Sequence, residues 1–177
     1  MFRSMAVLAA ALSVSLVISS CGEKFKPTST DISGSQLPSH ESWNSNVIFS
    51  DSSITKAVLK AGKISVYSEG GFTLVDSGAV VEFYSNGVIV STLKGGRGKV
   101  NDKTKDIEIY DSVSVVSKDS VKLFTDKLFW NNASRMVSTN EFVRIRTPEE
   151  EIQGYGFESD QSLSNYRIFK VSGTFTN

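Results

Sequence analysis

One cysteine is the residue of this chain best placed for covalent chemistry. Cys21 is the only cysteine, and it follows a positive Arg3 and an apolar stretch, residues 5–18, that only serines interrupt. This order of segments is typical of a secretory signal peptide, and the stretch is shorter than the roughly 20 apolar residues of a membrane-spanning helix. Ile18-Ser19-Ser20-Cys21 has the layout of a bacterial lipobox, in which the thiol is acylated and the chain is cleaved just before it. The alternative is an uncleaved signal anchor with an incidental cysteine.

Cleavage at this site predicts three parts. Residues 1–20 are the expected signal peptide, and Cys21 would carry acyl chains, each buried methylene contributing about 0.8 kcal/mol to membrane attachment. Residues 21–42 are rich in Lys, Ser, Thr, Gly and Pro, which is typical of a flexible tether. Trp43 marks the expected start of a folded domain over residues 43–177. We therefore expect a lipid-anchored protein of the bacterial envelope, outside the cytoplasm.

Few other side chains offer chemistry. His40 is the only histidine and lies in the expected tether, so a zinc site of the His/Cys type and nucleophile systems that need histidine are close to excluded. Glu149-Glu150-Glu151 is expected to be a solvated turn. Nineteen basic and nineteen acidic residues are spread along the chain without a basic stripe, so nucleic acid is not an expected partner. A carboxylate-based glycan hydrolase stays open, because two acids suffice for that reaction. No acid has an apolar setting, however, and we expect no enzyme, metal or cofactor.

The elements that must position any site are predicted to be strands. Short segments rich in Val, Ile, Phe, Tyr and Thr recur between Gly, Asn, Asp and Ser, and they alternate apolar and polar side chains, as in Ser112-Val113-Ser114-Val115. One apolar face per strand predicts two packed antiparallel sheets, in a sandwich or jelly roll. A short helical turn is expected over residues 160–164. The predicted strands are 47–50, 54–59, 63–67, 72–76, 80–84, 88–93, 97–101, 107–110, 113–116, 121–124, 127–130, 135–138, 142–146, 151–157 and 166–175.

An internal repeat supports stacked strand pairs. Shifting the chain by thirty residues overlays apolar on apolar positions and Asn101 on Asn131. The apolar overlays are Leu93 on Leu123, Ile107 on Val137, Val113 on Val143 and Val115 on Ile145.

These features together resemble a known family. Residues 105–146 contain the step Leu123-Phe124-Thr125-Asp126-Lys127-Leu128-Phe129-Trp130 between two strands, and Gly154-Tyr155-Gly156-Phe157-Glu158-Ser159 follows near the C-terminus. This order resembles the LptA/LptC (OstA-like) lipopolysaccharide-export family over residues 43–166. The resemblance implies an all-β, twisted open β-jelly roll. Its best-known members carry a transmembrane anchor, so acylation at Cys21 leaves the inner membrane as the expected location and the outer membrane as an alternative.

The resemblance also implies a function without catalysis. Such a protein receives lipopolysaccharide from the periplasmic jelly-roll domains of an inner-membrane ABC transporter and passes it to an LptA-like bridge protein. Acyl chains would lie in an apolar groove, because exposing apolar area to water costs about 25 cal/mol per Å². The same residues could instead be packed core. The expected groove residues are Val66, Phe72, Leu74, Val81, Phe83 and Leu123.

Partner proteins are expected at the edges of the sheet, where strand addition satisfies unpaired backbone groups. The resemblance implies that the first strand, with Val47 and Phe49, meets the transporter. It implies that the C-terminal strands, with Gly154 and Gly156, meet the bridge protein; these glycines would permit a bulge or a close backbone approach. The alternative in each case is an ordinary hairpin. The alternative function is a lipid-anchored surface or adhesion β-sandwich with a sealed core and no lipid transfer.

Overall fold

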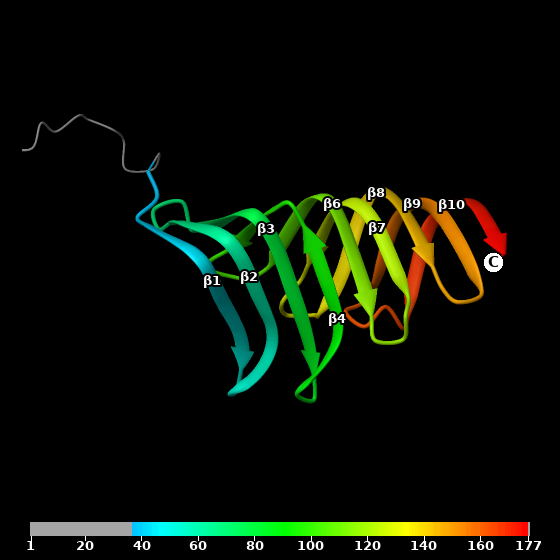
Figure 1. Cartoon of the computed structure of the whole chain (residues 1–177), viewed down its shortest axis with the longest axis horizontal. Coiled ribbons are helices and arrows are strands. Elements are labelled where there is room, and N and C mark those ends of the chain that lie inside the picture. The colour runs from blue at the N-terminus through cyan, green and yellow to red at the C-terminus, as the bar shows by residue number, and fades with distance from the viewer. Residues whose placement is uncertain (1–36, 177) are drawn as a thin grey trace, which may run out of the picture. The chain divides into compact units, whose positions relative to one another are not determined.

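The computed structural model describes residues 37–176, and all of its regular structure in this range is β-strand (Figure 1). No helix that could cross a membrane occurs in this part of the chain. The strands are β1 (His40–Asp51), β2 (Ile54–Tyr67), β3 (Phe72–Ser85), β4 (Val88–Gly95), β5 (Arg97–Asn101), β6 (Ile107–Ser117), β7 (Lys122–Trp130), β8 (Met136–Arg146), β9 (Glu150–Asp160) and β10 (Tyr166–Thr176).

The strands form one antiparallel sheet in which neighbours in sequence pair with each other. β4 and β5 both lie between β3 and β6, so they are two pieces of one strand interrupted at Gly96. β1 pairs only with β2, and β10 pairs only with β9. The sheet therefore has two edges, one at each end of the described chain. The predicted all-β class is confirmed. The two packed layers that we expected from two sheets come from a single sheet.

A row of β-bulges folds this sheet into two facing layers. The register shifts near the middle of most ladders, as between Ala61 and Lys63 and between Tyr110 and Val113. Gly78 and Asp111 have left-handed backbone conformations at these points, with φ of 89° and 69°. Bulges bend strands and increase their twist. The ribbon of the sheet accordingly curves back over itself (Figure 1).

The two layers enclose a core built from rows of paired side chains. One row runs through Val47, Leu59, Val81, Leu93, Val115, Leu123 and Ile145. The other runs through Val66, Thr73, Val100, Ile107, Trp130, Val137 and Ser159. Trp130 joins the layers, since its ring centroid lies 5.3 Å from that of Phe83 and 6.1 Å from that of Phe49. The interior is thus filled along most of the sheet.

The thirty-residue repeat is confirmed at the level of hydrogen bonds. Asn101 and Asn131 each begin a turn at the end of a strand, with their side-chain oxygens accepting from backbone N–H groups in that turn. The amide of Lys105 donates to the Asn101 carbonyl, and the amide of Arg135 donates to the Asn131 carbonyl, both at 2.8 Å. Lys105 and Arg135 have φ of 63° and 59°. The two turns are therefore equivalent and lie one repeat apart.

Two expectations need correction. The first strand begins at His40, so residues 40–42 belong to the sheet and not to the tether that we assigned to residues 21–42. The expected helical turn over residues 160–164 is a non-helical turn. It is organised by the Asp160 carboxylate, which accepts from the amides of Ser162 at 2.9 Å and Ser164 at 3.2 Å. Ser and Asn side chains favour such turns over a helix.

Candidate functional site

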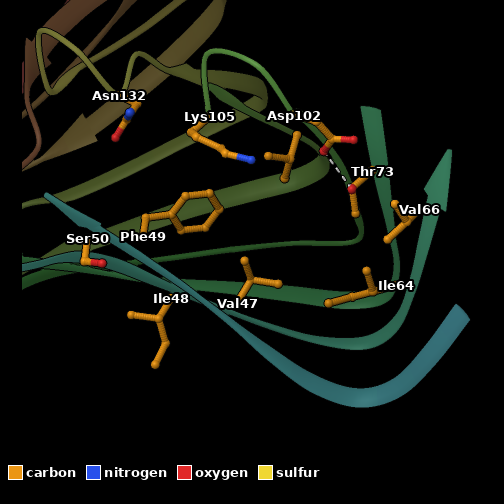
Figure 2. A pocket seen from close by; sticks show the side chains of 11 residues that line it. Val47, Ile48, Phe49, Ser50, Ile64, Val66, Thr73, Asp102, Lys105 and Asn132 are labelled. Carbon is orange, nitrogen blue, oxygen red and sulfur yellow. Dashed lines mark hydrogen bonds between the residues drawn. The ribbon is translucent and has the colours of Figure 1, made fainter. Parts of the chain in front are cut away.

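A pocket of about 370 Å³ opens between the two layers at the β1 end of the sheet (Figure 2). Its lining is apolar on one side and polar on the other. The lining residues are Val47, Ile48, Phe49, Ser50, Ile64, Val66, Thr73, Val100, Asp102, Lys105 and Asn132. The volume falls within the roughly 300–1,000 Å³ of small-molecule sites.

The apolar wall comes mainly from the first two strands. Val47 and Phe49 lie on β1, and Ile64 and Val66 lie on β2, so alternation turns all four inward. Phe49 is only 6% exposed, and its ring meets Trp130 edge-on, which closes the inner end of the pocket. Ile48, between the two inward residues of β1, points away from the pocket (Figure 2) and is 64% exposed. The pocket is therefore continuous with the core but stops at Phe49.

The polar wall comes from the two equivalent turns of the repeat. The Thr73 hydroxyl donates to the Asp102 carboxylate at 2.9 Å, which fixes Asp102 at the rim (Figure 2). The Asn132 amide donates to a carboxylate oxygen of Asp106 at 2.9 Å, and its side-chain nitrogen donates to the Thr104 carbonyl at 3.2 Å. These bonds tie the first turn to the second. The Lys105 side chain extends over the pocket from the first turn (Figure 2).

One ion pair joins two residues that lie next to pocket-lining residues in the sequence and the turn. Asp51, which follows the lining residue Ser50 at the end of β1, lies 3.7 Å from a guanidinium nitrogen of Arg135. Arg135 belongs to the same turn as the lining residue Asn132. The two ionic side chains are 70% and 39% exposed, so the pair is weak, as exposed ion pairs generally are.

The structure distributes the six expected groove residues over three environments. Val66 lines the pocket. Val81, Phe83 and Leu123 are at most 1% exposed and pack within the core, away from the pocket. Phe72 and Leu74 lie on the opposite face of β3 from the buried Thr73 and Val75, and Phe72 stacks on Tyr67 with a centroid distance of 4.9 Å. These residues therefore do not form one surface.

The sequence reasoning missed Ile64, Val100, Lys105 and Asn132 as pocket residues. The two turns carry a signal that could have found the polar pair, because Lys105 and Asn132 belong to the repeat-equivalent turns that begin at Asn101 and Asn131. The turns of a stacked repeat lie next to each other.

The expected partner edges are placed differently from each other. Val47 and Phe49 lie on β1, which is an edge strand. Gly154 and Gly156 do not lie on an edge, because β9 is paired with both β8 and β10; the edge strand is β10. A Cβ atom at Gly154 would overlap the Lys170 carbonyl, and Gly156 has a φ of 72°. The backbone of β10 therefore comes close at Gly154, and Gly156 adopts a left-handed conformation, which was not predicted.

The acidic run is not a solvated turn throughout, because Glu150 and Glu151 begin β9 and Glu151 forms ion pairs. Arg146 donates to Glu151 at 2.6 Å and 2.9 Å, and Arg144 lies 3.4 Å from its other oxygen. The hydrogen bonds from Arg146 and from Gln153 hold the pKa of Glu151 below its ordinary value. Within residues 37–176 no three His, Cys, Asp or Glu side chains gather as a metal site would require. Cys21 and the expected signal peptide lie outside the described residues.

Comparison with known proteins identifies the family. No protein with a curated description matches the sequence. A family model described as "Lipopolysaccharide-assembly, LptC-related" matches residues 6–174, which is nearly the whole chain. The bent antiparallel sheet and its end pocket are consistent with that match. The chain therefore belongs to the LptC-related family of lipopolysaccharide-assembly proteins, and with it to the proteins that serve lipopolysaccharide transport in the cell envelope.

Proposed function

We propose that this protein receives lipopolysaccharide from an inner-membrane ABC transporter and passes it to a periplasmic bridge of similar jelly rolls. Acyl chains enter the pocket at the β1 end and lie against Val47, Phe49, Ile64 and Val66. The observation that carries this proposal is the position of the apolar wall. It faces an opening of about 370 Å³ beside a free sheet edge, in a chain of the LptC-related family.

The pocket offers shelter for apolar groups, and no bond is made or broken there. Each Å² of acyl chain kept from water is worth about 25 cal/mol, so an apolar wall suffices to hold a chain in transit. The pocket's acidic side chain, Asp102, is bound by Thr73, and no second carboxylate lines the pocket with it. A glycan hydrolase, which works with a pair of carboxylates, is therefore not supported by this site.

The two sheet edges give the transfer a direction. The free edge of β1 lies next to the pocket and would pair with a strand of the transporter's periplasmic jelly-roll domain. The free edge of β10 lies at the other end of the sheet and would pair with the LptA-like bridge protein. A continuous sheet through all three proteins would keep their interiors aligned. Acylation of Cys21 would hold the protein at the inner membrane, with the outer membrane as the alternative.

Photo-crosslinking in cells tests the pocket. A photoreactive residue at Val66 is expected to capture lipopolysaccharide, because Val66 lines the pocket. Leu74 provides a matched control, since it lies on the paired strand one residue away from Thr73, the partner of Val66, but on the opposite face of the sheet. The readout is lipopolysaccharide bound covalently to the protein, compared at equal protein levels in exporting cells. Equal capture at both positions, or none at Val66, would contradict the proposal.

The second candidate is a surface or adhesion module that works with a sealed interior. The full burial of Val81, Phe83 and Leu123 favours it, because these residues fill the core at the expected position of the groove. The same crosslinking separates the two candidates. A sealed module would give no lipid adduct at Val66 even when the protein is folded and exported.

A further inference from the structure

Two cations occupy equivalent positions of the repeat: Lys105 lines the pocket, and Arg135 lies on the turn that carries the lining residue Asn132. We propose that Lys105 and Arg135 form a subsite for a phosphate-type anionic head, which holds the head of an amphiphile while its acyl chain occupies the pocket. The inference rests on the proposed function, and it adds a charge preference to the same site. In the empty protein, Asp51 occupies part of this subsite.

The backbone presents both cations in the same way. Lys105 and Arg135 each follow their turn asparagine by four residues, and their amides close the two turns at 2.8 Å. Each has a left-handed conformation, with φ of 63° and 59°, which L residues seldom adopt. The two turns are joined through Asn132, which contacts Asp106 and Thr104 of the first turn. The two cationic side chains therefore start from neighbouring, rigidly connected turns.

The two cations differ in what they already bind. Arg135 is paired with Asp51 at 3.7 Å, and this carboxylate comes from the end of β1, next to the lining residue Ser50. The Lys105 ammonium has no ion-pair partner within residues 37–176, although Lys105 lines the pocket. An anion at the mouth would bind the Lys105 ammonium and displace Asp51 from Arg135. A guanidinium suits this exchange because its paired donors match phosphate oxygens.

The other carboxylates at this rim are engaged elsewhere. Asp102 accepts from Thr73 at 2.9 Å. Asp106 accepts from the Asn132 amide at 2.9 Å and from the Thr104 hydroxyl at 2.7 Å. Asp51 is the one carboxylate of the rim that is paired with a cation of the subsite, and it is 70% exposed. The ion pair between Asp51 and Arg135 is therefore the contact that an anionic head would replace.

The test uses the full chain in a neutral detergent and two fluorescent probes with the same acyl tail. One probe ends in a phosphate monoester and the other in a hydroxyl. We expect the phosphate probe to bind about tenfold more tightly, which is the usual worth of a charge-assisted hydrogen bond. Lys105→Asn and Arg135→Asn should each remove most of this preference and leave the affinity for the hydroxyl probe unchanged. Asparagine is chosen because it tolerates the left-handed conformation of both positions.

Two further variants control the result. Lys103→Asn removes the same charge from the first turn at a position that neither lines the pocket nor matches Arg135 in the repeat, so it should keep the preference. Asp51→Asn should act in the opposite direction and tighten the phosphate probe about two- to fivefold, because it frees Arg135 from its competing carboxylate. Inorganic phosphate in large excess, without a tail, should displace neither probe.

The possible outcomes distinguish a failure of the proposed subsite from a failure of the proposed function. Equal binding of the two probes by the unaltered protein would overturn the subsite and leave the proposed function standing. A preference that survives both cation variants, or an Asp51→Asn protein with unchanged affinity for the phosphate probe, would also overturn it. Displacement of the probes by inorganic phosphate would mean that the ligand of the subsite is free phosphate and not an amphiphile. If neither probe binds, the proposed function itself is wrong, and the subsite with it.

Discussion

Asp160 determines the path of the chain between β9 and β10. Its carboxylate accepts from the amides of Ser162, Ser164 and Asn165 and from the Ser162 hydroxyl. Partial burial acts to raise the pKa of Asp160, but the hydrogen bonds from Ser162, Asn165 and Ser164 outweigh it, so the pKa lies below its ordinary value. The folded protein therefore favours the charged form of this side chain.

Replacing Asp160 with Asn should lower the free energy of unfolding by about 1–2 kcal/mol at neutral pH, because charged hydrogen bonds are lost. The stabilisation from a carboxylate with a lowered pKa is present above its unfolded value, about 3.9, and disappears as the pH falls through the lower folded value. The gap between the two proteins should consequently shrink below about pH 4. Urea unfolding between pH 3 and pH 7 measures it. Asp119→Asn, at an exposed turn, is the control and should change stability little. A pH-independent gap would contradict the assignment.

Sequence reasoning found the inward face of some strands but not of β3. In β6, Val113 and Val115 alternate with Ser112 and Ser114, and the predicted burial of the two valines is confirmed at 2% and 1% exposure. In β3, Leu74 is next to Val75, and Val80 is next to Val81, so both faces carry apolar side chains. Alternation tells which residues share a face, but it cannot tell which face is inside. Phe72 and Leu74 were grouped with Val81 and Phe83 for this reason.

At the level of elements, the bulges decide the fold. Gly78 has a φ of 89°, and a Cβ atom built there meets no atom within 4 Å. The position therefore has space for a side chain but a backbone conformation that side chains disfavour. Its amide also donates to the Gly96 carbonyl at 3.0 Å, which links the bend in β3 to the break between β4 and β5.

Gly78→Ala should therefore destabilise the protein by about 1 kcal/mol through backbone strain alone. Gly78→Asn should cost clearly less, because Asn adopts the left-handed conformation more readily despite its larger size. Thermal or urea unfolding of the three proteins gives the order. If Asn costs more than Ala, crowding and not conformation controls this position, and the bend depends on something other than φ.

The predicted strands were too short because bends were taken for turns. Ile107 to Tyr110 and Val113 to Val116 were predicted as two strands, and they are the two halves of β6. The residues between them, Asp111 and Ser112, are of types that favour turns and have φ of 69° and 56°. A bulge needs the same residue types as a turn but does not reverse the chain. The local sequence is thus the same for a bulge and for a turn. Only the pairing of the flanking segments with neighbouring strands distinguishes the two.

On the scale of the whole sheet, β10 is an edge strand with unusual exposure. Phe169, Val171 and Phe175 are 54%, 59% and 55% exposed, and one side of the strand has no neighbour within residues 37–176. Natural edges are usually protected by charge or by a covering element. This edge is consistent with a partner that pairs there.

If the proposed LptA-like bridge protein pairs with β10, Val171→Lys should weaken its binding by about tenfold, because a lysine on an edge strand opposes strand addition. It should leave the free energy of unfolding almost unchanged, since Val171 is exposed. Val116→Lys is the matched control: Val116 is 43% exposed, but β6 is paired on both sides, so binding should not change. Titration of the purified proteins measures both affinities. Equal binding by both variants would place the partner elsewhere.

The order of strands could not be read from the sequence, and this caused the misplaced edge. The strand class, the repeat and the family all follow from patterns along the chain. Gly154 and Gly156 would lie at an edge only if β9 were the last strand of the sheet. In the structure β10 pairs with β9 beyond them. Pairing depends on contacts between segments, and local composition does not encode which strand comes last.

Because strands pair with their neighbours in sequence, and β4 and β5 together take one place in the sheet, the thirty-residue repeat is a modular unit. Removing or duplicating one repeat would shorten or lengthen the rows of core side chains. The outer edges of β1 and β10 would stay as they are. The separation of the two edge strands would then depend on the number of repeats. The two edge strands would not need to change, and hence no new docking partner would be required.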